Sequence, residues 1–275
     1  MSKPFPTPSN GRLDEAALRA AVLTPGSIWS ALDVVAQTGS TNADLMAAAR
    51  AGAAHGTVLA AEQQSSGRGR QGRTWATPPA ARALTFSVLL RPAAVRPGDR
   101  GWLPLLAGVA AARALRAAAA VDAVLKWPND VLAGGAKLAG ILAEQADDAI
   151  VVGIGINVGA RAQDLPAPRP GALPPTSLAL LGAASTDRTA LLIAVLRELA
   201  AWYQRWTAAG EATASGLRAE YLRQCATIGT AVRVELPGGA RLTGTATGID
   251  ASGQLVVATA AGPARVSAGD VIHLR

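Results

Sequence analysis

Short apolar runs separated by turn residues recur along the chain and predict a protein that mixes strands with helices. Residues 32–36 and 57–62, and the segment LTFSVLLRP at 84–92, have the length and composition of strands. Three further runs, AVLKW, AKLAGILAEQ and AIVVGIGINV, predict three buried strands between residues 123 and 158. Turn signals of the PND, GG and DD types accompany these runs.

Segments with a helical spacing of apolar residues alternate with the predicted strands. The clearest begins at Ser40, Thr41 and Asn42, which are residue types that cap helices, and it ends near Gly52. The proline-rich residues 160–176 instead predict a loop. The predicted helices span residues 12–23, 40–52, 102–120, 187–208 and 213–225.

The chain changes character near residue 227. From there to residue 275, short β-type runs alternate with GG, DASG and AGP turns, which predicts a small barrel of about five strands. Because so short a segment has a small core, we expect it to dock on the preceding domain. Residues 1–11 predict a loose tail, and the leader leaves no room for a three-helix DNA-reading module. The predicted division is residues 1–28, 29–226 and 227–275.

Composition places the chain among globular proteins. Half of its 275 residues are hydrophobic and 16% are charged, which excludes a disordered chain. We expect no apolar stretch long enough to cross a bilayer, and the N-terminus lacks a secretory pattern, so a cytoplasmic location is predicted. The single Cys225 excludes an internal disulfide and a cysteine-based metal site, and the distance in sequence between His55 and His273 disfavours a histidine-based one.

The charge balance suggests anionic partners. A net charge of +7 fits nucleic acid, phosphorylated ligands or an acidic protein, although an arginine-rich composition alone also explains it. Only three of the 26 basic residues are lysines, namely Lys3, Lys126 and Lys137. Where arginine fills nearly every cationic position, each lysine is a candidate for chemistry that needs a compact ammonium group.

The segment EQQSSGRGRQGRTW at residues 62–75 carries the strongest chemical signal. Gly67, Gly69 and Gly72 free the backbone to point its N–H groups at an anion, and the alternating arginines add donors suited to phosphate or carboxylate. We expect this loop to be mobile when empty and ordered around an anionic ligand. The conformational entropy lost when the loop residues are ordered is similar in free energy to the charge-assisted hydrogen bonds gained with an anion. The alternative is a solvated linker, which the flanking strands and Trp75 disfavour.

Three further segments add weaker signals. KWPND at 126–130 places Asn129 and Asp130 after a strand, where they suit Mg²⁺ or form an ordinary turn. In GGAKLAGILAE, Lys137 is either a donor to a phosphate or a lysine at an exposed strand end. In GIGINV at 153–158, the glycines either let a ligand ring approach the backbone or pack a core strand.

In this order, the segments resemble the biotin–protein ligase family. The matching motifs are STN at 40–42, GRGRQGRTW at 67–75, KWPND at 126–130, KLAGIL at 137–142 and GIGINV at 153–158, with TSL at 176–178 also similar. The resemblance implies an α+β fold: a mixed-sheet catalytic domain related to class II synthetase and lipoate ligase folds, followed by a small SH3-like β-barrel. The chain departs from many relatives at Gln71, where they have arginine.

The resemblance also implies an activity: biotin and ATP form biotinyl-5'-AMP, and biotin then passes to a lysine of a biotin carboxyl carrier domain of an acyl-CoA or pyruvate carboxylase. It implies Lys137 and Arg70 as catalytic residues. The implied biotin-binding residues are Ser40, Thr41, Asn42, Gln63, Gly67, Arg68, Gly69, Arg70, Lys137 and Gly140. The implied nucleotide-binding residues are Arg70, Arg73, Trp75, Asn129, Asp130 and Asn157, with Asp130 and Asn157 toward Mg²⁺.

Other functions remain as alternatives. A lipoate–protein ligase or octanoyltransferase shares the implied fold but carries an RRxSGGG-type loop, which is absent from this sequence. An RNA-binding module needs stacking aromatics, yet only 4% of the chain is aromatic. A non-catalytic biotin-binding regulator is disfavoured by the presence of Lys137 and Asp130. We expect a weak homodimer to be possible and expect neither DNA nor a membrane as a partner.

Overall fold

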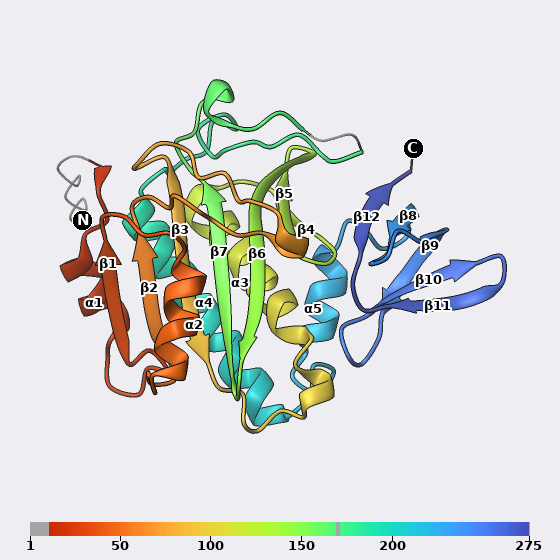
Figure 1. Cartoon of the computed structure of the whole chain (residues 1–275), viewed down its shortest axis with the longest axis horizontal. Coiled ribbons are helices and arrows are strands. Elements are labelled where there is room, and N and C mark those ends of the chain that lie inside the picture. The colour runs from red at the N-terminus through yellow and green to blue at the C-terminus, as the bar shows by residue number, and fades with distance from the viewer. Residues whose placement is uncertain (1–10, 169–170, 275) are drawn as a thin grey trace.

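A seven-stranded mixed sheet forms the centre of the structure, a computed structural model that describes residues 11–168 and 171–274 (Figure 1). The order of its strands is β1-β2-β3-β7-β6-β5-β4. β1 and β2 are parallel, and every other neighbouring pair is antiparallel. The strands are β1 (Ala31–Val35), β2 (Thr57–Ala61), β3 (Ala83–Leu90), β4 (Ala123–Lys126), β5 (Asp130–Ala133), β6 (Ala136–Ala146) and β7 (Ala149–Asn157).

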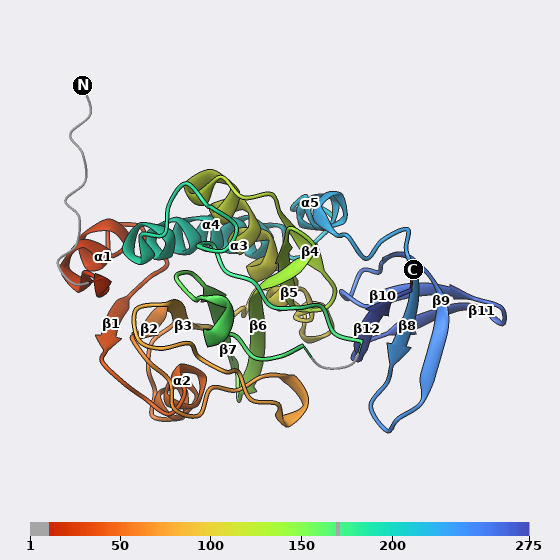
Figure 2. The ribbon, with the colours of Figure 1, turned by 90° about the horizontal axis from the view of Figure 1, so that it is seen from above.

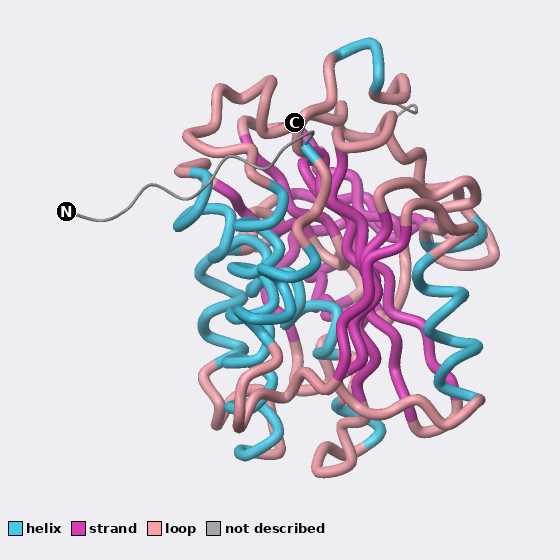
Figure 3. Tube along the Cα trace, turned by 90° about the vertical axis from the view of Figure 1, so that its left-hand side faces the viewer, coloured by secondary structure: helices cyan, strands magenta, loops and turns pink. Residues whose placement is uncertain are grey.

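Helices cover both faces of this sheet unequally. Figure 2 shows α1, α3, α4 and α5 on one face and α2 alone on the other, and the same two layers flank the strands in Figure 3. The sheet therefore has two covered faces, which is why β3 is buried along its whole length. The helices are α1 (Glu15–Val22), α2 (Thr41–Arg50), α3 (Trp102–Ala119), α4 (Arg188–Ala209) and α5 (Leu217–Gln224).

The helix α3 is the core helix of the larger layer. By length and composition alone α3 is long and apolar enough to span a bilayer, although it contains Pro104, Gly108, Arg113 and Arg116. However, 72% of it is buried inside the fold, as a core helix requires. Its apolar residues pack against the sheet and against α4. Its hydrophobicity is therefore explained by its place in the core.

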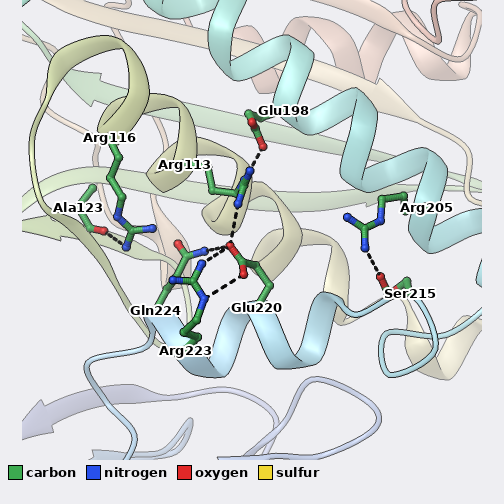
Figure 4. Close-up of polar contacts among 9 residues, drawn as sticks. All are labelled: Arg113, Arg116, Ala123, Glu198, Arg205, Ser215, Glu220, Arg223 and Gln224. Carbon is green, nitrogen blue, oxygen red and sulfur yellow. Dashed lines mark hydrogen bonds and ion pairs between the residues drawn. The ribbon is translucent and has the colours of Figure 1, made fainter.

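One arginine links three helices of this layer. Arg113 of α3 donates to Glu198 of α4 at 2.7 Å and to Glu220 of α5 at 3.1 Å, and Arg223 also pairs with Glu220 at 2.7 Å (Figure 4). The hydrogen bonds to Glu198 and Glu220 raise the pKa of Arg113. This network fixes α4 and α5 against α3 on the side away from α2.

The C-terminal residues form a second sheet that docks on the first unit, as expected. Its order is β11-β10-β9-β8-β12. Trp127 donates its backbone N–H to Thr227 at 3.1 Å and its indole N–H to Gly253 at 3.2 Å, and Trp102 donates to Ala251 at 2.6 Å. The strands are β8 (Ala231–Glu235), β9 (Arg241–Ile249), β10 (Leu255–Thr259), β11 (Gly262–Val266) and β12 (Asp270–His273).

The structure confirms the α+β class and differs from the sequence prediction in two elements. Between residues 123 and 158 it has four strands, because β5 (Asp130–Ala133) follows the PND turn directly and is too short to show periodicity. The helix expected over 213–225 begins only at Leu217, because Gly216 adopts a left-handed φ of 77°. Most of the tail predicted for residues 1–11 lies outside the described residues.

Candidate active site

A cavity of about 700 Å³ lies on the α2 side of the central sheet. Strands β6 and β7 supply its floor, residues 68–76 cover it, and β8 and β12 of the C-terminal sheet close one end. We call residues 67–73 the flap. The flap, the central strands β6 and β7 and the C-terminal strands β8 and β12 are distant in sequence and meet at this cavity.

One register row of the sheet runs beneath the cavity. Gly155 pairs with Gly140, Gly140 with Asp130, and Asp130 with Lys126. Paired residues on neighbouring strands share a face of the sheet, so this row points into the cavity. At about 4.8 Å per strand, Lys126 lies about 10 Å beyond Gly140, toward the C-terminal sheet.

A buried polar network forms the other end of the cavity. Ser40 caps α2, so the first turn of this helix brings Thr41 and Asn42 against the sheet. Thr41 Oγ1 lies 2.7 Å from Ser87 Oγ, and Ser87 donates to Asn42 Oδ1 at 2.6 Å. Asn42 in turn donates to Glu144 at 2.8 Å. Each of these side chains is held by a neighbour, so the network presents a rigid polar wall.

Two predicted biotin contacts do not line the cavity. Gln63 is exposed, whereas its neighbour Gln64 lines the cavity and accepts the backbone N–H of Thr41 at 2.8 Å. The alternation of side chains along an extended segment, invisible without the register, places one inside and one outside. Gly67 lies at the base of the flap, where its carbonyl accepts the N–H of Trp75 at 2.9 Å.

The flap is a hairpin closed by its own backbone. Gly69 donates to the carbonyl of Arg73 at 2.6 Å, and Gln71 at the tip has a left-handed φ of 56°. A Cβ on Gly67 would lie 2.6 Å from the carbonyl oxygen of Trp75, so glycine is required there. Whether the flap orders only around a ligand stays a prediction.

Cations of the flap contact both ends of the site. Arg68 lies 3.6 Å from Glu144, at the polar network, and Arg73 forms an ion pair with Asp270 of β12. Between them, Arg70 Nη1 is 3.4 Å from both the Asn129 side chain and the Gly269 carbonyl oxygen. Burial lowers the pKa of Arg70, and the nearby charge of Asp130 partly opposes that effect. The C-terminal sheet therefore helps to hold the flap over the cavity.

Trp75 fills the space that the sequence assigned to a ligand ring. A Cβ on Gly155 would lie 2.6 Å from its indole, and one on Gly140 would lie 2.8 Å from it. Gly153 is covered instead by Asn42, whose Oδ1 would lie 2.2 Å from a Cβ. In this conformation the glycines of β6 and β7 accommodate side chains of the protein itself, because the Trp75 indole lies against Gly140 and Gly155 and Asn42 lies against Gly153.

The predicted catalytic lysine lies beside the predicted metal carboxylate. Lys137 Nζ is 2.6 Å from Asp130 Oδ1 and 5.8 Å from the centre of the Trp75 ring. The backbone of Lys137 is held on the other side by the loop, with its N–H donating to Pro174 at 2.8 Å. Asn157 is oriented by its donation to the carbonyl of Thr176 at 2.9 Å. The strand ends and the loop thus aim these side chains into one cavity.

Most of the predicted residues meet in this cavity, but several lining residues were not predicted. The predicted ones that line it are Ser40, Thr41, Asn42, Arg68, Gly69, Arg70, Arg73, Trp75, Asn129, Asp130, Lys137, Gly140 and Asn157. Those missed include Gln64, Thr85, Phe86, Lys126, the described part of 166–173, and Glu235 and Asp270–Ile272 of the C-terminal sheet. No local motif marks the C-terminal contributors, because they reach the site only through docking.

Described Asp, Glu, His and Cys residues form no cluster of three or more that could hold a metal ion. Asp130 is the carboxylate that lies inside the cavity floor, and its Oδ1 is buried without a hydrogen-bond partner apart from the ion pair with Lys137. One carboxylate is sufficient for an Mg²⁺ ion that arrives with phosphate oxygens. The donor set therefore fits Mg²⁺ carried by a nucleotide and does not fit a resident metal centre.

A mixed sheet, a glycine-jointed cationic flap and a docked small β-domain together define the class of biotin and lipoate protein ligases. The sequence profile described as the Biotin/lipoate A/B protein ligase family matches residues 35–160, and the Biotin protein ligase C terminal domain matches residues 227–274. The chain belongs to the biotin protein ligase family and is a ligase.

Individual relatives agree with this assignment. The biotin–[acetyl-CoA-carboxylase] ligase of Mycobacterium tuberculosis is 47% identical over 96% of both chains. The bifunctional ligase/repressor of Bacillus spizizenii is 31% identical over 95% of this chain and 79% of its own. The biotin protein ligase from Aquifex aeolicus in complex with biotin and ATP has a TM-score of 0.74 and 27% identity, covering 90% of this chain and all of the other.

Proposed function

We propose that this protein activates biotin with ATP to form biotinyl-5'-AMP and then transfers biotin to a lysine of a carrier domain. The carrier belongs to acetyl-CoA carboxylase, as the name of the Mycobacterium tuberculosis relative indicates, or to a pyruvate carboxylase. The observation that carries the proposal is the placement of Lys137 and Arg70 around Asp130 in a cavity that also holds a polar network. The catalytic and binding roles proposed below for individual residues depend on this placement.

In the first half-reaction, two anions must approach each other. The Asn42 end offers hydrogen-bond partners for the neutral polar ring of biotin, and Lys137 and Arg70 attract its carboxylate and the α-phosphate. The carboxylate oxygen attacks the α-phosphorus, a C–O–P anhydride bond forms, and the bond to the β-phosphate oxygen breaks. Positive charge held in place before reaction stabilises the charge that develops.

Lys137 needs to exchange partners during this step. Its ammonium is paired with Asp130 at 2.6 Å, so an arriving phosphate competes with a carboxylate for the same cation. Asp130 is placed to hold an Mg²⁺ ion that would arrive with the triphosphate, and the ion would neutralise phosphate charge when bound. Asn129 and Asn157, both oriented by backbone carbonyls, are placed to hydrogen-bond the nucleotide.

In the second half-reaction, the flap protects a hydrolysable anhydride. Ion pairs at its two ends, from Arg68 to Glu144 and from Arg73 to Asp270, keep it over the cavity and exclude water. The amine of the carrier lysine attacks the anhydride carbonyl, an amide bond forms, and AMP leaves. Asp130 or solvent accepts the proton that the amine must lose.

The remaining proposals concern organisation and partners. We assign the catalytic unit to residues 29–226 and the SH3-like unit to 227–275, preceded by the leader 1–28. An exposed edge strand of the central sheet suits a carrier that adds a strand, and the same edge suits a weak homodimer. Cytoplasmic location and the absence of DNA and membrane partners complete the proposal.

An ATP–pyrophosphate exchange assay tests this function, run with biotin, with lipoate and with no added acid. Exchange that depends on biotin is the expected result. Exchange with lipoate and not biotin would assign the chain to the other branch of the matched family. If no label entered ATP with either acid, adenylate formation in this cavity would be refuted.

A further inference from the structure

One cation of the cavity, Lys126, has no role in the function proposed above. It ends β4 and is paired in register with Asp130, so it belongs to the row that points into the cavity. The next residue, Trp127, is buried and bonded through its backbone and its indole to Thr227 and Gly253. The backbone that carries Lys126 is therefore held rigidly against the C-terminal sheet.

The ammonium of Lys126 lacks a partner of its own. Among the cations that line the cavity, Arg68, Arg70, Arg73 and Lys137 each make a hydrogen bond or ion pair with the protein. No such contact joins Lys126 Nζ to any residue in the described ranges 11–168 and 171–274. The side chain is only partly exposed, so water replaces that partner incompletely.

The surroundings of Lys126 disfavour its charge. Burial lowers its pKa, and the positive charges of Lys137 and Arg70 lower it further, although Asp130 acts in the opposite direction. A partly desolvated ammonium among other cations gains most from an anion that bonds to it directly. Its place therefore favours an anionic part of a ligand rather than a neutral one.

The position of Lys126 identifies which anion this is. The polar network that suits the biotin ring lies at β3 and β7, and Lys137 faces the middle of the row. Lys126 lies at the opposite end, near β12, where burial and, to a lesser extent, the charge of Lys126 lower the pKa of His273. Lys137 Nζ lies 2.6 Å from Asp130, and Lys126 is the neighbour of Asp130 on the next strand, about 5 Å farther toward the C-terminal sheet. A ligand whose reacting centre is at Lys137 therefore reaches Lys126 with the group next to that centre.

We propose that Lys126 binds the β- and γ-phosphates of ATP and stabilises the pyrophosphate leaving group. This inference rests on the proposed function, because it adds a residue to the first half-reaction. When the bond from the α-phosphorus to the β-phosphate oxygen breaks, its electron pair passes to the pyrophosphate, and the Lys126 ammonium bonds to that oxygen charge. No proton transfer is needed. The second half-reaction, which contains no pyrophosphate, does not use Lys126.

Binding of inorganic pyrophosphate with Mg²⁺ to the ligand-free protein, followed by calorimetry, tests the proposal directly. We expect Lys126→Met to weaken binding at least tenfold, equivalent to about 1.4 kcal/mol. Lys126→Arg should restore binding to within about threefold, since it keeps the charge. Arg197→Met, a change on exposed α4 surface, removes the same net charge and should leave binding unchanged.

Kinetics separate this residue from a merely structural one. In Lys126→Met, the KM for pyrophosphate in exchange should rise at least tenfold, while transfer from preformed biotinyl-5'-AMP to a carrier domain stays within twofold. Unchanged pyrophosphate binding in Lys126→Met, or a transfer rate that falls as much as exchange, would overturn the proposal. If Lys126→Met does not fold, failure of Lys126→Arg to bind pyrophosphate has the same consequence. Wild-type exchange that does not depend on biotin would instead count against the proposed function. Calorimetry with pyrophosphate tests Lys126 separately, because it needs no biotin.

Discussion

Replacing Gly153 with alanine tests the polar network at the closed end of the cavity. The new Cβ would lie 2.2 Å from Asn42 Oδ1 and 2.9 Å from Asn42 Cγ, which no real contact tolerates. Both atoms belong to a side chain that is itself bonded on two sides, so the clash cannot be relieved by a small movement. Asn42 must leave its place in the network.

The cost follows from the bonds that Asn42 makes. Ser87 donates to it at 2.6 Å, and it donates to the Glu144 carboxylate at 2.8 Å. Losing one neutral and one charge-assisted bond costs about 2–4.5 kcal/mol. The lower backbone entropy of alanine in a strand returns about 0.5–1 kcal/mol. The net loss is about 1–4 kcal/mol, or a fall in Tm of roughly 2–15 °C for a chain of this size.

Thermal unfolding of the purified variant measures this loss, and isothermal titration with biotin measures its effect on binding. Gly248→Ala is the matched control, because Gly248 also lies in a strand and its Cβ would meet nothing within 4 Å. In an Asn42→Ala background, the Gly153→Ala change should cost nothing further, since the clashing group is gone. Equal stability of Gly153→Ala and Gly248→Ala would refute the reasoning.

Three further predictions follow from the flap, the catalytic pair and the histidines. Lys137→Ala and Arg70→Ala should each lower adenylate formation more than tenfold, over about 1.4 kcal/mol, and near-normal pyrophosphate release by both would remove their assigned roles. Asp270→Asn breaks the ion pair with Arg73 that holds the flap, so trypsin should cleave the flap faster in this variant. The control is Asp148→Asn, which removes the same charge from the ion pair with Arg91 at the other end of the sheet. Equal cleavage rates in the two variants would contradict the role of Asp270 in holding the flap. Burial lowers the pKa of both His55 and His273 below the ordinary value of 6.5, aided by Arg91 and Lys126 respectively. The unfolded chain then binds these protons more readily, so stability is complete above pH 6.5 and decreases as the pH falls from 6.5 toward the folded-state values. Urea midpoints at pH 7.5 and 5.5 check this, and the His273→Asn variant should lose less stability over that range than the wild type.

The local elements of the fold were accessible from the sequence because each depends on neighbours in the chain. The cap at Ser40 and the glycines of the flap act within a few residues, so their patterns predicted a helix start and a turn. The sequence did not predict β5, because its four residues are too few to show a hydrophobic period. The helix predicted over 102–120 is confirmed as α3, and its burial against the sheet and α4 explains why so many of its residues are apolar.

Tertiary structure decided which of the candidate residues share the cavity. The pairing of Gly140 with Asp130, and of Asp130 with Lys126, places three strands in one row that no spacing in the sequence shows. The extended segment after β2 turns Gln64 toward the cavity and leaves Gln63 exposed.

The sequence by itself determined which chemical groups this protein has. The cationic flap, the lysine of β6 and the polar cap of α2 follow directly from residue types and their order in the chain. Tertiary structure alone decided their partners, including Asp270 for the flap and Trp75 for the glycines of β6 and β7. The physical reason is range. Capping and turn preferences act over a few residues, whereas strand register and domain docking join groups that are separated by up to about 200 residues, such as Arg73 and Asp270.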